Sequence, residues 1–348
     1  MKSDSALQRL PSGRDEQVAE RTLRPKDFSD FLGQERLLEP LKVMIQAAQA
    51  REEVLEHLLF VGPPGLGKTS LAHVLAAELQ CPMRVTSGPA LERAKDLVGI
   101  LSGLEVGSLL FIDEIHRVPR AVEEYLYGAM DNFRLEFTLD QGIHARLLRL
   151  DLPPFLLVGA TTREALLGAP LRSRFGQTLH FEPYETPALE AILERSAGIL
   201  GVECPLPARQ ALARNSRGTP RIANRLLRRA RDVAQVEGGG QVVPEVVQRT
   251  FELLGIDGNG LERSDRRILE SLARMGGGPV GLKTIAAAVD EAEDTVEWVV
   301  EPWLIRQGFL ARSPQGRLLL ENGWKAIGQT DPGGAQLPLM EATENGES

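Results

Sequence analysis

The segment Gly62-Pro-Pro-Gly-Leu-Gly-Lys68-Thr69 constrains the chain most, because it matches the phosphate-loop pattern G-x-x-x-x-G-K-[ST] at every fixed position. An apolar run over 58–61 precedes it as a buried strand, and leucines repeat every fourth residue in the helix expected after it. Glycines let backbone N–H groups surround a phosphate, and Lys68 neutralises charge between the β- and γ-phosphates. Thr69 offers a hydroxyl to Mg²⁺. A glycine-rich turn without a ligand is the weaker alternative, because both flanks fit a nucleotide site.

Length, charge and cysteine usage limit the class of protein. With 348 residues the chain is too long for one core, so two or three domains are expected. The formal net charge of −8 argues against binding nucleic acid over the whole surface and leaves local basic patches. Cys81 and Cys204 lie far apart without metal-ligand spacing, which indicates buried residues in a reducing compartment. The N-terminus lacks an apolar export segment and no apolar run is long enough for a bilayer, so a cytoplasmic location is expected.

A second apolar strand, over 109–112, ends in two adjacent carboxylates, Asp113 and Glu114. Paired acids at a buried strand end repel each other and are costly to desolvate, so they indicate a bound cation or a catalytic role. Asp113 is predicted to join the Mg²⁺ shell, and Glu114 is predicted to activate water against the γ-phosphate. A solvated strand end that opens a helix is the weaker alternative.

A third strand, over 155–160, ends in Thr161-Thr162-Arg163, where a polar side chain would touch the γ-phosphate or the attacking water. Threonine is also common at strand ends, so this pair is weak by itself. Downstream, Arg172 and Arg174 lie beside a proline turn. They are either surface charge or the planar donor fork that a phosphoryl transition state receives from a neighbouring subunit. The second interpretation predicts an oligomer.

Residues 134–150 alternate between apolar and polar side chains around the turn Asp140-Gln141-Gly142, which predicts a hairpin. It is either an edge hairpin of the main sheet or a docking ribbon whose apolar tip, near Ile143, meets a partner. The sequence does not separate these alternatives.

After Pro183 the composition changes to helices, expected over 187–200, 207–214 and 220–236. Between Arg209 and Arg231 there are eight arginines and no acid. Such a stripe is either a nucleic-acid surface or, more commonly, a solvated helix face. Arg221, at the start of the last helix, is predicted to reach the γ-phosphate and couple this lid to the nucleotide state.

Three further helices are expected over 264–272, 282–289 and 295–306, followed by a short hairpin, which together predict a winged helix. A protein-interaction module is the alternative. From Ile256 to Ser348, nine Lys and Arg are outnumbered by fifteen Asp and Glu. DNA contact is therefore predicted at the hairpin alone, where Arg312 and Arg317 have no acid between them. The residues after 328 are expected to form a disordered acidic tail.

Taken together, these features resemble the AAA+ ATPases and, within them, the RuvB family of branch-migration motors. The residues that carry the resemblance are Leu23-Arg24-Pro25, Gly33-Gln34-Glu35, Gly62 to Thr69, Val85 to Ala90, Phe111 to Arg117, Gly159 to Arg163, Arg174-Phe175-Gly176, Arg217 to Arg229 and Gly278 to Leu282. The implied fold is α/β: a parallel-sheet P-loop AAA+ ATPase domain, a helical lid and a C-terminal winged helix. The expected division is a flexible arm 1–20, the ATPase domain 21–183, the lid 184–255, the winged helix 256–328 and the tail 329–348.

The resemblance implies a homohexameric ring that hydrolyses ATP with Mg²⁺ and drives branch migration of Holliday junctions. The processes implied are DNA recombination, DNA repair and the SOS response to DNA damage. The implied partners are four-way junction and duplex DNA, a RuvA-like junction-binding protein docked on the 134–150 hairpin, and a junction resolvase.

The resemblance also assigns site residues one by one. The nucleotide is assigned to Leu23, Arg24, Gly62, Gly65, Gly67, Lys68, Thr69, Ser70, Asp131, Asn132, Phe133, Arg174, Tyr184 and Arg221. Thr69 and Asp113 are assigned to the metal, and Arg312 and Arg317 to DNA. The catalytic set is Asp113, Glu114, Thr162, Arg174 and Arg221, with Arg174 acting on the next subunit.

Three departures from the family pattern bear on these assignments. Gln315 replaces a usual arginine between the two wing arginines, and Glu293 stands where a basic residue is common. The segment Asp131-Asn132-Phe133 is more often Glu-Asp-Phe. We expect DNA contacts to be weaker or to use other residues, and the ATPase centre to be intact.

Two other functions use parts of the same machinery. A clamp loader or another ATP-driven remodeller shares the nucleotide site, but a loader is expected to end in a helical collar. An ATP-gated DNA-binding switch would not turn over, and the intact Asp113, Glu114 and Arg174 weigh against it.

Overall fold

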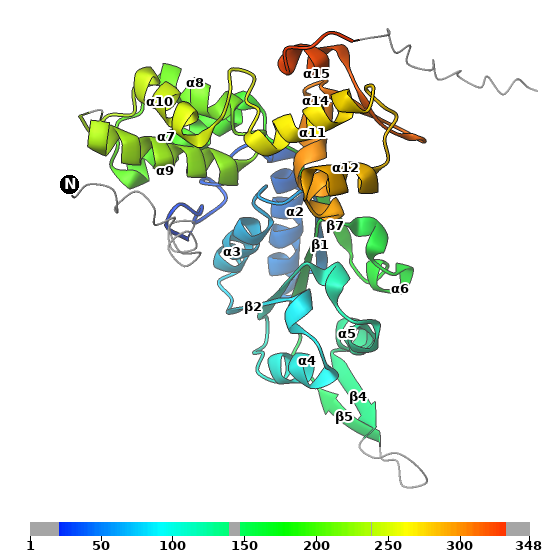
Figure 1. Ribbon diagram of the computed structural model, residues 1–348. Helices are drawn as coiled ribbons and strands as arrows, with labels where there is room; N and C mark the ends of the chain where they lie inside the picture. The colour runs from blue at the N-terminus through cyan, green and yellow to red at the C-terminus, as the bar shows by residue number, and fades with distance from the viewer. Residues whose placement is uncertain (1–20, 139–146, 238, 332–348) are drawn as a thin grey trace, which may run out of the picture. The chain divides into compact units, whose positions relative to one another are not determined.

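The computed structural model describes residues 21–138, 147–237 and 239–331 (Figure 1). The chain divides into two compact units, the first ending at Val247 and the second beginning at Gln248. The predicted N-terminal arm, the hairpin tip near Ile143 and the tail from 332 onward lie outside the described residues.

A five-stranded parallel sheet forms the centre of the first unit, in the order β2-β3-β6-β1-β7. Its strands are β1 (Leu58–Val61), β2 (Met83–Ser87), β3 (Leu109–Asp113), β6 (Leu156–Thr161) and β7 (Gln177–His180). Strands β1, β3 and β6 are apolar and almost wholly buried, as expected for parallel strands covered on both faces. Because β6 pairs with both β1 and β3, the three predicted chemical segments end at the same edge of the sheet.

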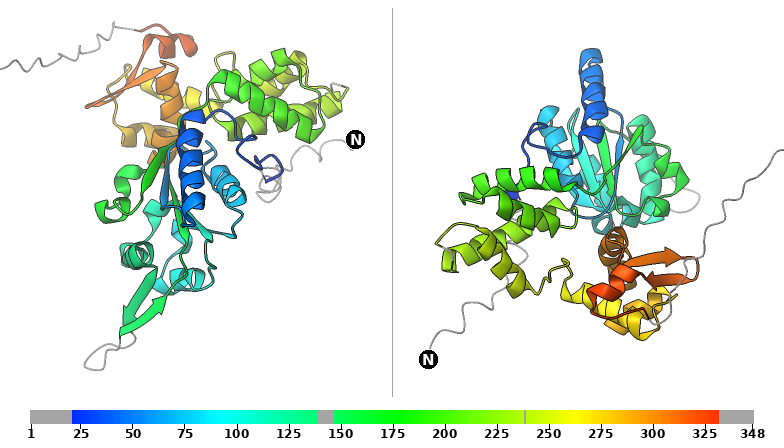
Figure 2. Two further views of the ribbon diagram at one scale, coloured as in Figure 1. Left: turned by 180° about the vertical axis from the view of Figure 1, so that it is seen from behind. Right: turned by 90° about the horizontal axis from the view of Figure 1, so that it is seen from above.

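Helices cover this sheet and supply the rest of its core. They are α2 (Glu35–Arg51), α3 (Lys68–Glu78), α4 (Ala94–Leu101), α5 (Arg120–Asn132) and α6 (Ala169–Arg172), with short 3-10 turns η1 (Gly88–Ala90), η2 (Ile115–Arg117) and η3 (Glu164–Leu166). Helix α2 runs alongside the strands (Figure 2) and buries Leu38, Leu41 and Ile45. That face follows from apolar residues three or four apart.

The predicted hairpin consists of β4 (Arg134–Thr138) and β5 (Leu147–Asp151), which form a separate two-stranded antiparallel sheet. Cross-strand ion pairs join Arg134 to Asp151 at 2.6 Å and Arg149 to Glu136 at 2.9 Å. The hairpin projects away from the main sheet (Figure 1). The alternative that it is an edge hairpin of that sheet is therefore wrong, and the docking role stays a prediction.

The lid consists of α7 (Thr186–Leu200), α8 (Leu206–Arg214) and α9 (Pro220–Glu237), close to the predicted bounds. These helices gather beside the sheet as a separate bundle (Figure 2). Helix α9 buries an alanine and leucine face that includes Leu226 and Leu227. A further helix, α10 (Pro244–Leu254), was not predicted, although Val246, Val247 and Phe251 are buried at helical spacing.

The second unit contains the predicted winged helix. Its elements are α11 (Arg263–Arg274), α12 (Leu282–Val289), α13 (Glu293–Thr295), the π-helical turn η4 (Val296–Val300), α14 (Glu301–Arg306), the wing strands β8 (Leu310–Ser313) and β9 (Gly316–Leu319), and α15 (Glu321–Ala326). Buried side chains from α11, α12 and the η4–α14 segment pack together with two tryptophans, Trp303 and Trp324, in one apolar core.

The third helix of this unit differs from the continuous helix that the sequence predicts. The Glu301 N–H donates to the Val296 carbonyl five residues back, which defines the π turn. The next residue, Pro302, has no N–H, so it cannot restore the four-residue bond. The break lies where Glu297 and Glu301 face the wing, as described below.

His57, immediately before β1, is a buried histidine with both ring nitrogens engaged. Its Nδ1 accepts the Leu157 N–H at 3.0 Å, and its Nε2 lies 3.2 Å from the Met130 carbonyl. Burial lowers the pKa of His57 below its ordinary value of 6.5. Both ring nitrogens are therefore used in contacts with the backbone, which join β6 to the end of α5.

We expect acidification to destabilise the protein through His57. Below about pH 6.5 the unfolded chain binds more protons at this residue than the folded chain does. The stabilisation is therefore complete above that pH and is lost as the pH falls, by at most about 1.4 kcal/mol per pH unit for one proton. Melting curves between pH 5 and 8 should show a flatter dependence for His57→Gln than for the unaltered protein. Exposed His180→Gln is the control, and equal slopes for all three proteins would contradict the assignment.

Candidate functional site

The phosphate loop lies between β1 and α3, and its glycines adopt backbone angles that other residues disfavour. Gly65 has φ +80° and Gly67 has φ +99°. A Cβ at Gly65 would lie 2.7 Å from the Thr219 side chain at the start of α9. The loop therefore needs glycine here both for its conformation and for contact with the lid.

Lys68, the first residue of α3, is buried inside the loop. Its Nζ donates to the Gly62 carbonyl at 2.6 Å and to the Pro63 carbonyl at 2.8 Å. Burial lowers the pKa of Lys68 to about 8, while the nearby Asp113 and Glu114 carboxylates oppose that shift. The ammonium is thus held at the helix N-terminus, where an anion is most favoured.

The acid pair lies at the end of β3, beside the loop. Glu114 adopts φ +48°, and its N–H donates to Asp113 Oδ1 at 3.0 Å. From the end of β6, the Thr162 hydroxyl donates to Glu114 Oε2 at 3.3 Å. The fold thus brings together three predicted residues from two strands.

The lid closes over this edge of the sheet through hydrogen bonds to backbone atoms. The Tyr184 hydroxyl donates to the Leu66 carbonyl at 3.1 Å, and the Arg221 N–H donates to the Gly65 carbonyl at 3.4 Å. Arg195 Nη2 donates to the Leu23 carbonyl at 2.7 Å. These bonds connect the lid to the phosphate loop and to the segment before α2, within the first compact unit.

One pocket lies between the loop, the acid pair and the lid. The predicted residues that line it are Leu23, Arg24, Gly65, Gly67, Lys68, Thr69, Ser70, Asp113, Glu114, Tyr184 and Arg221. It is also lined by Asp30, Phe31, Ile192, Arg195 and Asn224, which are not among the predicted site residues. Asn224 Oδ1 and Arg195 Nε are buried there without a partner among the described residues. Their position depends on how the lid packs, so no local motif indicates it.

Other predicted residues lie outside the pocket of their own chain. The Gly62 carbonyl accepts from Lys68, and the Gly62 N–H donates to the Thr161 carbonyl at 3.1 Å. Thr162 reaches the site through Glu114. Arg174 pairs with Asp131 at 2.9 Å, and its guanidinium carbon lies 4.4 Å from the Tyr127 ring centroid. Asn132 ends α5, and the Phe133 ring packs edge-on against Phe155. Arg174 and Asp131 thus lie together, whereas the Phe133 ring packs against the core, and none of these residues lines this pocket.

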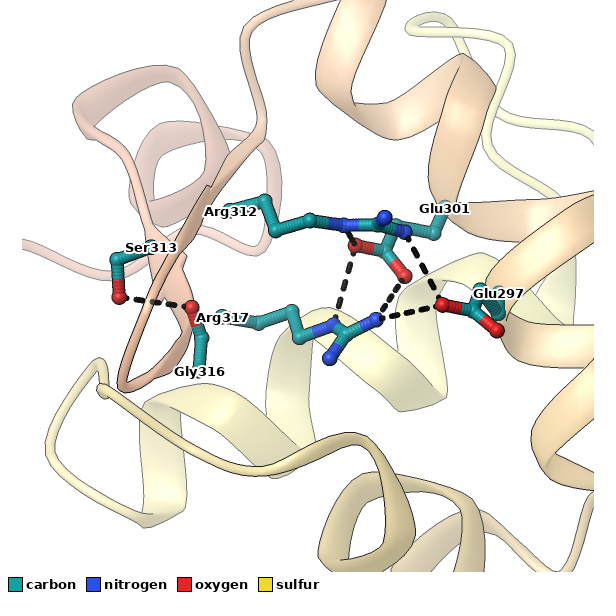
Figure 3. Close-up of polar contacts among 6 residues, drawn as sticks. All are labelled: Glu297, Glu301, Arg312, Ser313, Gly316 and Arg317. Carbon is teal, nitrogen blue, oxygen red and sulfur yellow. Dashed lines mark hydrogen bonds and ion pairs between the residues drawn. The ribbon is translucent and has the colours of Figure 1, made fainter. Parts of the chain in front are cut away.

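In the second unit, the two predicted DNA-contacting arginines converge on one carboxylate (Figure 3). Arg312 and Arg317 are directly paired across β8 and β9. Glu301 Oε1 accepts from Arg312 Nε at 3.0 Å and from Arg317 Nε at 3.1 Å, and its Oε2 accepts from Arg317 Nη2 at 2.9 Å. Glu297 lies 3.6 Å from each arginine.

These ion pairs divide the roles of the two arginines. The Glu301 side chain is 2% exposed and Arg317 is 13% exposed, whereas Arg312 is 47% exposed. Removing either partner of a buried pair leaves an uncompensated charge, so Arg317 and Glu301 hold the wing to the third helix. Arg312 retains an exposed edge that can meet a phosphate. The assignment of both arginines to DNA stays a prediction.

No helix in 21–138, 147–237 or 239–331 combines the length and apolar content needed to cross a membrane. Within the same ranges, no group of three or more His, Cys, Asp or Glu side chains is arranged to hold a metal ion.

Family models match nearly the whole described chain in three consecutive segments. Residues 23–181 match the Holliday junction DNA helicase RuvB P-loop domain, and residues 184–257 match the RuvB AAA lid domain. Residues 258–328 match the RuvB C-terminal winged helix domain.

Individual proteins agree with these models. A Holliday junction branch migration complex subunit RuvB from Myxococcus xanthus is 53% identical over 90% of this chain and 92% of its own length. The protein of the same name from Streptomyces avermitilis is 49% identical over 95% of this chain and 93% of its own. The solved structure of the Thermotoga maritima RuvB Holliday junction branch migration motor aligns with a TM-score of 0.82 and 45% identity, covering 89% of this chain and all of that one.

Proposed function

This chain belongs to the RuvB family, and from that premise we propose how its residues drive branch migration of Holliday junctions by hydrolysing ATP. One observation carries the proposal. The phosphate loop, the acid pair and Thr162 converge at one edge of the sheet, under a lid that contributes Arg221. The clamp-loader alternative is wrong, because the family models include the RuvB winged helix.

The pocket fits an ATP–Mg²⁺ complex by the chemistry of its donors. Lys68, Gly65 and Gly67 would hold the phosphates, and Leu23, Arg24 and Tyr184 would frame the rest of the nucleotide. The Thr69 hydroxyl and the Asp113 carboxylate are hard oxygen ligands, which Mg²⁺ prefers together with phosphate oxygens. Such a site needs no larger cluster of side-chain ligands. Bound Mg²⁺ would neutralise charge that develops on the phosphates.

Hydrolysis would use the residues at the ends of β3 and β6. Glu114 takes a proton from the attacking water, because its carboxylate lines the pocket next to the phosphate loop. Thr162 donates a hydrogen bond to that carboxylate and so reports its state to β6. Arg221 approaches from the lid and would meet the γ-phosphate.

We propose that the active form is a hexameric ring in which each pocket is completed by the next subunit. Arg174 does not line its own pocket, yet a guanidinium fork suits a phosphoryl transition state. Its ion pair places Asp131 beside it, which supports a shared role for these two residues in the neighbouring site. Electron microscopy with a four-way junction and an ATP analogue tests this assembly. Rings of six are expected, and monomers alone would contradict it.

The β4–β5 hairpin is the proposed binding site for a RuvA-like junction-binding protein, because it forms its own sheet and projects from the rest of the first unit. A junction resolvase is proposed as a further partner. These partners and junction DNA belong to the compartment that holds the chromosome, so we propose that the protein acts in the cytoplasm.

DNA contact is proposed at the wing, through Arg312 first and Arg317 second. We expect Arg312→Ala to weaken binding equally for all sequences, because phosphate contacts carry no base identity. The log–log dependence of affinity on salt should become shallower by about 0.9 for the lost contact. Fluorescence anisotropy with duplex DNA at several salt concentrations measures this slope.

The paired variant Arg317→Ala serves as the structural comparison. It should lower stability by roughly 3 kcal/mol, since the buried Glu301 then keeps only Arg312 as a close partner. A melting curve beside each salt series separates the two roles. An unchanged slope with a lowered melting temperature for Arg312→Ala would end the DNA assignment of that residue.

The whole proposal is tested by steady-state ATP hydrolysis with and without junction DNA, together with strand exchange on a synthetic four-way junction. Turnover coupled to branch migration is expected. Nucleotide binding without turnover would favour the ATP-gated switch instead.

A further inference from the structure

A buried histidine lies under the catalytic carboxylate and touches it. His116, in the η2 turn directly after the acid pair, has a side chain that is 6% exposed. Its Nδ1 lies 3.3 Å from Glu114 Oε2 and 2.8 Å from the hydroxyl oxygen of Thr161, the last residue of β6. The same hydroxyl oxygen accepts the Arg163 N–H at 2.9 Å. One ring nitrogen therefore joins the end of β3 to the end of β6.

The neighbours of Nδ1 determine which group donates. An Nδ1 lone pair would face the negative Glu114 oxygen, which is repulsive, so we assign the proton to Nδ1, whose N–H then donates. The Thr161 hydroxyl oxygen and Glu114 Oε2 are its two acceptors. Burial lowers the pKa of His116, which keeps the ring neutral with a single proton available for this contact.

The backbone around the histidine is fixed by close packing. Glu114 turns the chain in the left-handed region, and Ile115 is buried in the core of the sheet. Gly88 lies so close to the Glu114 carbonyl that an added Cβ would collide with it. The turn has little freedom, so the His116 ring acts from a rigid support.

We propose that His116 is a positioning residue for hydrolysis, whose Nδ1–H fixes Glu114 Oε2 and links it to Thr161. This inference rests on the proposed role of Glu114 as the general base. Both His116 and Thr162 contact the same oxygen, Oε2. In this arrangement the other oxygen, Oε1, takes the proton from water. A base held in one orientation is more effective than one that rotates, since a misplacement of about 1 Å can cost a hundredfold in rate.

Two substitutions at this position separate the hydrogen bond from packing. His116→Leu removes the donor. His116→Asn keeps an N–H close to the Nδ1 position, because Nδ1 of histidine and Nδ2 of asparagine are both bonded to Cγ. We expect His116→Leu to lower kcat about tenfold to a hundredfold with KM for ATP and nucleotide affinity nearly unchanged. His116→Asn should retain kcat within a few-fold. If the Leu variant does not fold, His116→Gln takes its place, because its amide lies one methylene farther out.

The decisive measurement adds each change to Glu114→Gln. When the base is absent its orientation no longer matters, so His116→Leu should cause no further loss of residual turnover in that background. Equal losses in both backgrounds, or equal effects of Leu and Asn with a lowered melting temperature, would overturn the proposal in favour of simple packing. If Glu114→Gln alone leaves turnover intact, the proposed function of the acid pair fails instead. If Glu114→Gln is inactive and His116→Leu is fully active, only the positioning role fails.

Discussion

Arg174→Ala is expected to lower ATP hydrolysis about a thousandfold while nucleotide binding changes little. The arginine does not line the pocket of its own chain, so its loss removes no contact to nucleotide bound there. Its loss would remove charge stabilisation from the transition state in the neighbouring site. Binding of a fluorescent ATP analogue and steady-state hydrolysis measure the two effects separately.

A matched control lies two residues away. Arg172 is a surface arginine whose Nη1 lies 3.9 Å from Glu164, and its side chain is 49% exposed. Arg172→Ala should therefore leave hydrolysis near its original rate. Rings that mix Arg174→Ala with Glu114→Gln subunits should regain part of the activity, because some interfaces then join an intact Glu114 to an intact Arg174. If every mixture is as inactive as its parents, Arg174 does not act between subunits.

Glu114→Gln is expected to reduce turnover by about a hundredfold or more, since it removes the general base and leaves the shape of the side chain. Asp113 and Thr69 are untouched, so nucleotide and Mg²⁺ binding should persist. Single-turnover hydrolysis separates this loss from slow product release. Glu92→Gln is a suitable control, because Glu92 is an exposed acid of the same unit. Full turnover by Glu114→Gln would exclude Glu114 as the base.

The sequence predicted those parts of the site that lie in short contiguous motifs. The phosphate loop, the acid pair and Thr162 each follow a buried strand, and parallel strands end at the same edge of a sheet. Their meeting in space follows from that rule. His116 stood inside a recognised motif, but its role depends on Thr161, which is 45 residues away in sequence.

What the sequence could not predict depends on packing between distant segments. Asn224 and Arg195 enter the pocket only because the lid closes on the loop. At the wing, the absence of an acid between Arg312 and Arg317 suggested free positive charge. The partner is Glu301, which belongs to the preceding helix and is 11 residues before Arg312. Local charge patterns do not reveal a pairing made by the fold.

The bond between the Arg221 N–H and the Gly65 carbonyl attaches the N-terminal end of α9 to the phosphate loop. The helix has 18 residues, and at 1.5 Å per residue it is about 27 Å long. Its N-terminal end lies on the phosphate loop, and the helix packs against α7 and α8. A tilt of about 10° at the phosphate end would displace the far end by about 5 Å over that length. Such a displacement would exceed the rise of one base pair of duplex DNA, about 3.4 Å.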